Sequence, residues 1–73
     1  MRLGNYITTL TRPELDKFKE YINATDEEII IIDNLVKRKS LVQIAELLNV
    51  SVPTVSRRIR QIDKKRRREV RNG

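Results

Sequence analysis

The chain contains neither cysteine nor histidine. It therefore cannot form disulfide bonds, zinc sites with thiolate or imidazole ligands, cysteine nucleophiles or Ser-His-Asp triads. The remaining acids and bases are carboxylates, and no glycine-rich phosphate loop accompanies them. We predict that the protein is not an enzyme and has no catalytic residues, no metal, no cofactor and no small-molecule substrate.

Glycine and proline are scarce, with two of each in 73 residues. This scarcity disfavours a turn-rich small barrel and favours helices. The longest apolar run, Ile29 to Ile32, is far shorter than the roughly 20 residues that span a bilayer, and no signal-peptide pattern opens the chain. We expect one small cytoplasmic domain with no membrane partner, held together by packing of its 23 Ile, Val, Leu and Phe side chains.

The net charge of +6 is distributed unevenly along the chain. Residues 1–36 carry four basic and seven acidic side chains, whereas residues 37–73 carry twelve basic and three acidic ones. Such a basic stretch is typical of proteins that bind phosphate backbones, but a solvated tail that confers solubility has the same composition. The two halves are expected to face different partners.

Capping signals and apolar spacing predict an all-α fold, a small helical domain of about four helices. Capping boxes of the form S/T-x-x-E/Q begin at Thr11, Thr25 and Ser40. They predict a helix of about three turns, a second helix over residues 26–38 and a third of two turns. Ile30 falls outside the apolar arc of the second helix, which leaves packing against the first helix or a dimer contact as its explanation.

The two ends of the chain lack this pattern. Residues 1–10 show no helical period and are predicted to form an extended N-terminal arm. The domain itself is placed at residues 11–66, with a fourth helix over roughly 52–66 and a basic C-terminal tail at 67–73. Either a helical extension or a loose polycation accounts for the run from Lys64 to Arg68.

A sharp three-residue turn is predicted between the third and fourth helices. Asn49 tolerates positive φ, Val50 is an apolar plug and Ser51 can cap a helix. Val52, which precedes Pro53, is the alternative cap position. The fourth helix buries one stripe and, at 100° per residue, its opposite face carries Pro53, Ser56, Arg57, Arg60 and Lys64.

The segment from Leu41 to Ile62 resembles the helix-turn-helix of sigma-factor region four (sigma-70 family) and of LuxR-type output domains. The residues that carry the resemblance are Ile44-Ala45, Val50, Ser51 and Thr54-Val55. The capped helix at Thr25 corresponds to the scaffold helix of those domains. Asn49 departs from the glycine that many helix-turn-helix proteins have there, but asparagine also suits a left-handed turn.

The resemblance implies sequence-specific binding of double-stranded DNA, with the fourth helix in the major groove, and a role in transcriptional regulation. The residues that it implies as base-reading are Pro53, Thr54, Ser56, Arg57 and Arg60. The expected phosphate contacts are Lys37, Arg38, Lys39, Arg58, Gln61, Lys64, Lys65, Arg66, Arg67 and Arg68. For Arg58, pairing with Glu46 is the alternative.

Other interpretations remain beside this one. The chain can be a generic helical bundle, or an adaptor module whose acidic N-terminal half docks a polymerase, recombinase or terminase partner. One protomer has one recognition helix, so binding to a palindromic site would require a homodimer. RNA recognition is disfavoured because Phe18, Tyr6 and Tyr21 all lie outside the basic half.

Overall fold

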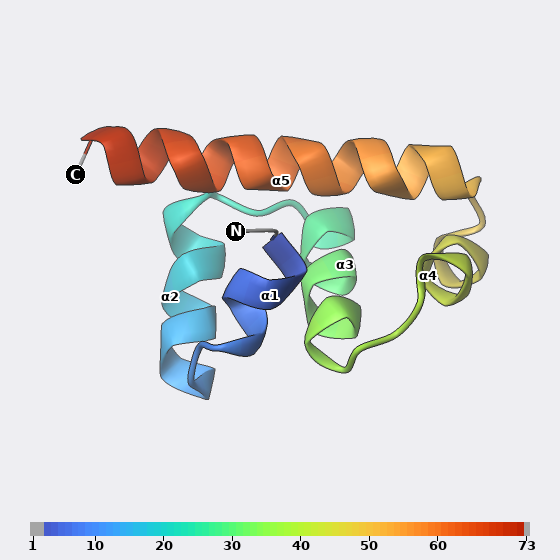
Figure 1. Ribbon diagram of the computed structural model, residues 1–73, viewed down its shortest axis with the longest axis horizontal. Helices are drawn as coiled ribbons and strands as arrows, with labels where there is room; N and C mark the ends of the chain where they lie inside the picture. The colour runs from blue at the N-terminus through green and yellow to red at the C-terminus, as the bar shows by residue number, and fades with distance from the viewer. Residues whose placement is uncertain (1–2, 73) are drawn as a thin grey trace.

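In the part of the chain that the structure describes, five α-helices form the regular structure, and they confirm the predicted all-α class. The computed structural model describes the backbone of residues 3–72 and the side chains of residues 3–67. Figure 1 shows the helices, which are α1 (Leu3–Thr8), α2 (Arg12–Tyr21), α3 (Asp26–Val36), α4 (Leu41–Leu48) and α5 (Val52–Asn72). Within this part of the chain no helix has the length and apolar character needed to cross a bilayer.

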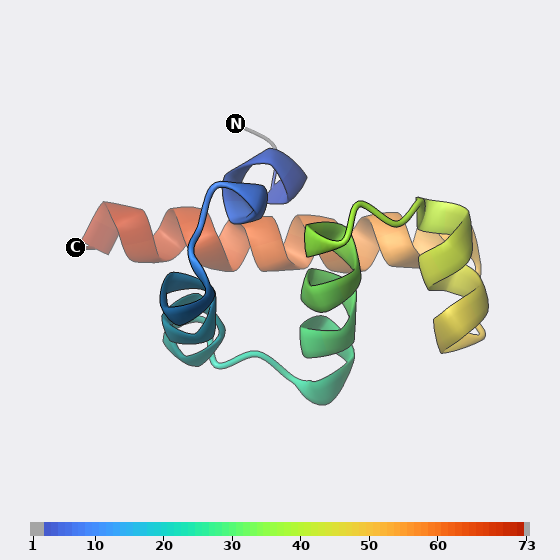
Figure 2. The ribbon, with the colours of Figure 1, turned by 90° about the horizontal axis from the view of Figure 1, so that it is seen from below.

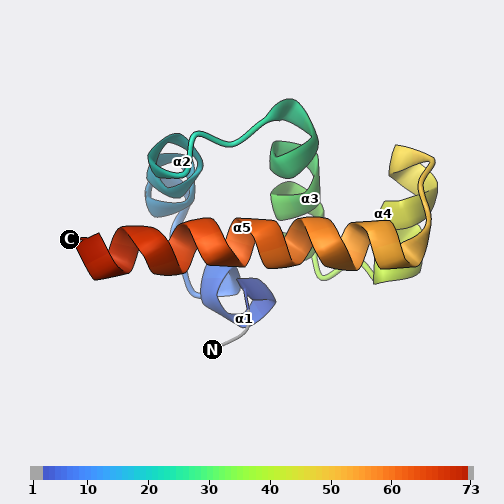
Figure 3. The ribbon, with the colours of Figure 1, turned by 90° about the horizontal axis from the view of Figure 1, so that it is seen from above.

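The long helix α5 organises the molecule. It lies along the longest axis and contacts α1, α3 and α4. Seen from above, α2 and α3 lie on one side of α5 and α1 lies on the other, while α4 crosses the N-terminal end of α5 (Figure 3). The outward face of α5 is therefore left uncovered along its length.

A single core connects the helices. The predicted apolar faces supply it: Val55 and Ile62 of α5 are fully buried, and Ile59 packs against them in part. The complete set of buried apolar side chains is Leu3, Ile7, Leu15, Phe18, Ile22, Ile31, Ile32, Ile44, Ala45, Val55 and Ile62. Ile30, by contrast, is 38% exposed.

All three predicted capping boxes are confirmed. Thr11, Thr25 and Ser40 each accept a hydrogen bond from the backbone N–H three residues on, and the Glu or Gln at that position accepts one from the cap backbone. The helix predicted over 26–38 ends earlier, at Val36. Arg38 has a φ of 61°, a left-handed conformation that no α-helix continues through.

The predicted N-terminal arm is wrong for residues 3–8, which form α1 instead. Residues 1 and 2 lie outside the described part of the chain. Leu3 and Ile7, one turn apart, are only 2% and 1% exposed, so burial of these side chains stabilises a helix too short to persist alone. The domain therefore begins before residue 11, its predicted start.

The predicted span of the last helix is too short. The backbone of α5 is helical from Val52 to Asn72, so most of the predicted tail at 67–73 belongs to the helix. Of the two explanations for the basic run after Ile62, the backbone geometry agrees with the helical extension.

Candidate nucleic-acid interface

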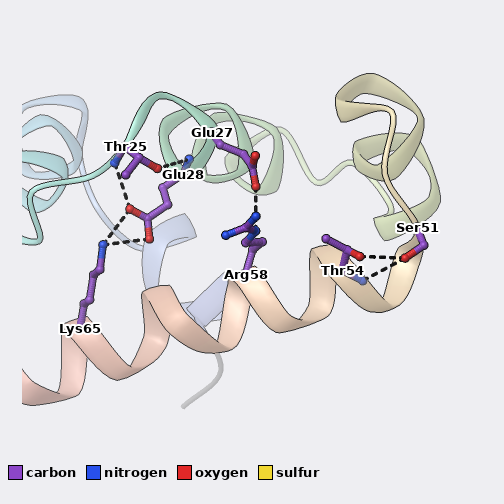
Figure 4. A network of polar contacts seen from close by, with 7 residues as sticks. All are labelled: Thr25, Glu27, Glu28, Ser51, Thr54, Arg58 and Lys65. Carbon is purple, nitrogen blue, oxygen red and sulfur yellow. Dashed lines mark hydrogen bonds and ion pairs between the residues drawn. The ribbon is translucent and has the colours of Figure 1, made fainter.

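The three-residue turn between α4 and α5 has the predicted chemistry. Asn49 adopts the left-handed conformation, with φ 58° and ψ 46°, and its N–H and that of Val50 donate to carbonyls of the last turn of α4. Ser51 Oγ accepts a hydrogen bond from Thr54 N at 3.3 Å and lies 2.9 Å from Thr54 Oγ1 (Figure 4). Ser51 is therefore the cap of α5, and Val52 is the first helical residue.

The corner is held by small and apolar side chains. Ala45 is 4% exposed and belongs to the core that α4 and α5 share, together with fully buried Ile44 and Val55. Val50 and Leu48 pack against this core in part. The packing fixes the direction of α5 relative to α4, and with it the direction of the outward face of α5.

Three cations follow one another along that outward face. Arg57, Arg60 and Lys64 are exposed at i, i+3 and i+7, and we call them the α5 ridge. Within residues 3–67 none of the three has a hydrogen-bond or ion-pair partner. Their charges are available to an anion outside the molecule.

On the flank of α5 that faces α3, two cations are already paired (Figure 4). Lys65 Nζ donates to both carboxylate oxygens of Glu28, at 2.8 and 3.0 Å. Arg58 Nε lies 2.9 Å from Glu27 Oε1, an ion pair without the alignment of a hydrogen bond. The alternative pairing of Arg58 with Glu46 is wrong, because Glu27 takes its place.

Glu28 is the only buried charged residue among the described side chains, at 6% exposure. Burial raises the pKa of its carboxyl, but the hydrogen bonds from Lys65 Nζ and from Thr25 N outweigh burial and hold the pKa below its ordinary value. Glu28 is therefore ionised at neutral pH, and Lys65 neutralises it. The pair ties the start of α3 to the middle of α5.

On the opposite flank Asp63 pairs with two further cations, Arg66 and Arg67. Arg66 donates to Asp63 Oδ1 from Nε at 2.9 Å and from Nη2 at 2.8 Å, and Arg67 Nε lies 3.4 Å from Asp63 Oδ2. The Arg66 guanidinium also stacks on Tyr6 of α1, 4.8 Å from the ring centroid. The side chain of Arg68, another predicted phosphate contact, lies outside the described residues.

The residues implied as base-reading lie together at the start of α5. Pro53, Arg57 and Arg60 are exposed, whereas Thr54 and Ser56 are half-buried. Ser56 and Arg60 border a groove of about 570 Å³, whose other walls include Asn5 of α1, Leu41 of α4 and Asp63. The position of α1 next to these residues was not predicted, because residues 1–10 were expected to form an extended arm.

The expected phosphate contacts do not share one surface. Gln61 and Lys64 are exposed on α5. The exposed run from Lys37 to Lys39 instead lies at the end of α3 that points away from α5 in Figure 1. The structure thus separates the predicted contacts into an outward set, an internally paired set and a distant set.

The internal partners of the cations were not predicted. For Asp63 a signal existed, because Arg66 and Arg67 follow it at the i+3 and i+4 spacing of helical ion pairs. No comparable signal links Glu28 to Lys65, which are 37 positions apart in the sequence.

Comparison with protein families, with curated protein sequences and with solved structures gives no match to this chain. In residues 3–67 no group of three acidic side chains is gathered in a way that could hold a metal ion.

Proposed function

We propose that the chain binds double-stranded DNA in a sequence-specific manner, with the N-terminal half of α5 in the major groove, and that it acts in transcriptional regulation. The observation that carries the proposal is the α5 ridge. Within residues 3–67 its cations have no internal partner, whereas the other cations of α5 in this range all have one. Unpaired cations beside a capped helix–turn–helix corner suit a polyanion that has a groove wide enough for a helix.

In this proposal the ridge combines two kinds of contact. Arg57 and Arg60 each offer a planar guanidinium that can donate two hydrogen bonds to the O6 and N7 of a guanine, a pairing worth about 1–3 kcal/mol against the wrong base. Ser56 contributes a hydroxyl beside them, and Pro53 and Thr54 lie at the groove edge. Lys64 and Gln61 contact phosphates and fix the register.

The paired cations of α5 contribute less to DNA binding in this proposal. Arg58, Lys65, Arg66 and Arg67 already satisfy a carboxylate. Moving one of them to a phosphate exchanges one ion pair for another, so each contributes less to affinity than an unpaired cation does. Arg58 and Lys65 instead tie α5 to α3, and Arg66 stacks on Tyr6 of α1.

Selection of bound duplexes from a random pool tests this function. We expect the wild-type chain to enrich a short consensus containing guanines, and Arg57→Ala and Arg60→Ala variants each to lose preference at one or two positions of it. Lys17→Gln, which removes an exposed cation of α2, is the matched control and should keep the full consensus. Equal recovery of every sequence would contradict specific readout.

A second candidate function is that of an adaptor that docks a protein partner. Tyr21 on α2 is 58% exposed, and the acidic side chains of Asp16 and Glu20 on the same helix are also exposed. An exposed aromatic side chain among charges is a frequent anchor of protein interfaces. A one-to-one complex with an added protein that Tyr21→Ala abolishes, and that Arg57→Ala does not, would support this function.

A further inference from the structure

A second basic surface lies at the far end of α3. Lys37, Arg38 and Lys39 are consecutive and exposed, and within residues 3–67 none of them has an ion-pair partner. Arg12, at the start of α2, borders the same hollow of about 380 Å³ as Lys37. We call these four residues the α3-end surface.

The acid that borders this hollow is already paired. Asp33, which borders the same hollow, accepts a hydrogen bond from Lys19 Nζ at 2.6 Å. The hollow therefore keeps an excess of positive charge from Arg12 and Lys37. The surface, like the α5 ridge, presents cations that have no ion-pair partner within residues 3–67.

The backbone holds these cations in a fixed place. Arg38 N donates to Leu35 O at 2.9 Å and Lys39 N donates to Asn34 O at 3.0 Å, which closes the end of α3. Ser40 then caps α4 directly. The run is thus a short structured corner between two helices rather than a free loop.

Helix capping alone does not explain why the residues of the α3-end surface are basic. Arg38 has a φ of 61°, while the other non-glycine residues with positive φ in the described backbone are Asn23 and Asn49. Asparagine adopts this conformation more readily than arginine, so a cation stands where the backbone favours another residue. A cation at the C-terminus of α3 suits the helix dipole, but Arg12 is the first residue of α2, where the dipole disfavours it.

The two basic surfaces face in different directions. The start of α3 is bound to α5 through Glu28 and Lys65, and its 11 residues then extend about 16 Å to the α3-end surface. Figures 1 and 2 show this end of α3 on the side of the molecule away from the outward face of α5. The separation exceeds the Debye length of about 8 Å at physiological salt, so each surface attracts anions on its own.

We propose that the α3-end surface binds the phosphate backbone of a second DNA duplex, so that one molecule bridges two duplexes. The proposal rests on the proposed function, in which the α5 ridge holds the first duplex. A straight duplex along the ridge cannot also reach the opposite side of the molecule, which measures 22 and 21 Å across its two shorter axes. The second contact carries no sequence preference, because lysines and arginines at a corner meet phosphates rather than base edges.

A two-duplex retention assay tests the bridge. One duplex of the sequence selected by the chain is immobilised on beads, a second, fluorescent duplex of unrelated sequence is added, and its retention is measured against protein concentration. The test variant is Lys37→Gln/Arg38→Gln/Lys39→Gln, and Lys17→Gln is the matched control. Affinity for a single duplex is measured for each chain by titration.

We expect wild type and Lys17→Gln to retain the fluorescent duplex. The triple variant should retain at least about tenfold less, while its affinity for a single duplex stays within about twofold, because the two surfaces are electrostatically separate. Equal retention by wild type and the triple variant would overturn the bridge, as would binding of the immobilised duplex without any retention. In both cases the proposed function stands, whereas failure of wild type to bind any duplex removes the function and the bridge together.

Discussion

Two adjacent lysines show how different the cations of this chain are. Lys64 is exposed and has no partner among the described side chains, whereas Lys65 donates to a buried carboxylate. In the sequence both belong to one basic run. Their roles differ because the helix turns by 100° per residue, which directs Lys65 to α3 and Lys64 to solvent.

Substitution of each lysine separates binding from stability. We predict that Lys64→Gln lowers the slope of log K against log salt for duplex binding by about 0.9, as expected for one lost phosphate contact, with no change in the thermal midpoint. Lys65→Gln should lower the midpoint and change the salt slope less. The measurements are duplex titrations at several salt concentrations and thermal unfolding. Equal salt slopes for the two variants would contradict the assignment.

The Glu28 carboxyl makes stability depend on pH. Its folded pKa lies below the unfolded value near 4.5, so the stabilisation is present above pH 4.5 and is lost as the pH falls through the folded pKa. We predict that Glu28→Gln costs about 1 kcal/mol at pH 7, since the 37% exposed Lys65 can return to water. The cost should shrink below pH 4.5, as denaturant unfolding of both chains at pH 7 and pH 3 can measure. A cost that is equal at both pH values would exclude the ion pair as its source.

The two arginines of the ridge should affect recognition without affecting folding. Arg57→Ala and Arg60→Ala are predicted to leave the free energy of unfolding within about 0.5 kcal/mol of wild type, because neither side chain has a partner in the part of the chain whose side chains are described. Binding to the selected duplex should weaken more than binding to a scrambled duplex. Equal weakening on both duplexes would instead make these residues phosphate contacts.

At the scale of elements, the helices that begin with a capping box could be predicted from the sequence. Thr11, Thr25 and Ser40 mark their helices because the capping box is a local arrangement within four residues. Helix α1 has no such signal, since its six residues depend on burying Leu3 and Ile7 against distant helices. Tertiary packing of this kind cannot be derived from local preference.

The packing of α4 on α5 provides a test at this scale. Ala45 is almost fully buried in the core that these helices share, so there is no room for a larger side chain. We predict that Ala45→Leu destabilises the domain by about 1–3 kcal/mol through overpacking, and that Ala45→Ser costs less. Denaturant unfolding measures both. An unchanged midpoint for Ala45→Leu would mean that the helices do not approach each other closely at this residue.

At the scale of the whole molecule, the direction of α3 decides which cations can act together. The sequence placed Lys37, Arg38 and Lys39 in one set with the cations of α5, because charge and position along the chain say nothing of direction in space. The fold separates them, since α3 begins beside α5 and ends away from it (Figure 1). The face of α5 could be predicted from helical periodicity, but the internal partners and the second surface depend on how the helices are arranged.

The central claim is that the outward face at the start of α5 binds duplex DNA, and backbone amide chemical-shift mapping tests it most directly. A labelled chain is titrated with one equivalent of the selected duplex, and the shift of each amide is followed. The account predicts that the largest changes fall between Ser51 and Lys64, with small changes in α2. Changes concentrated in α2, or no changes along α5 at saturating duplex, would contradict it.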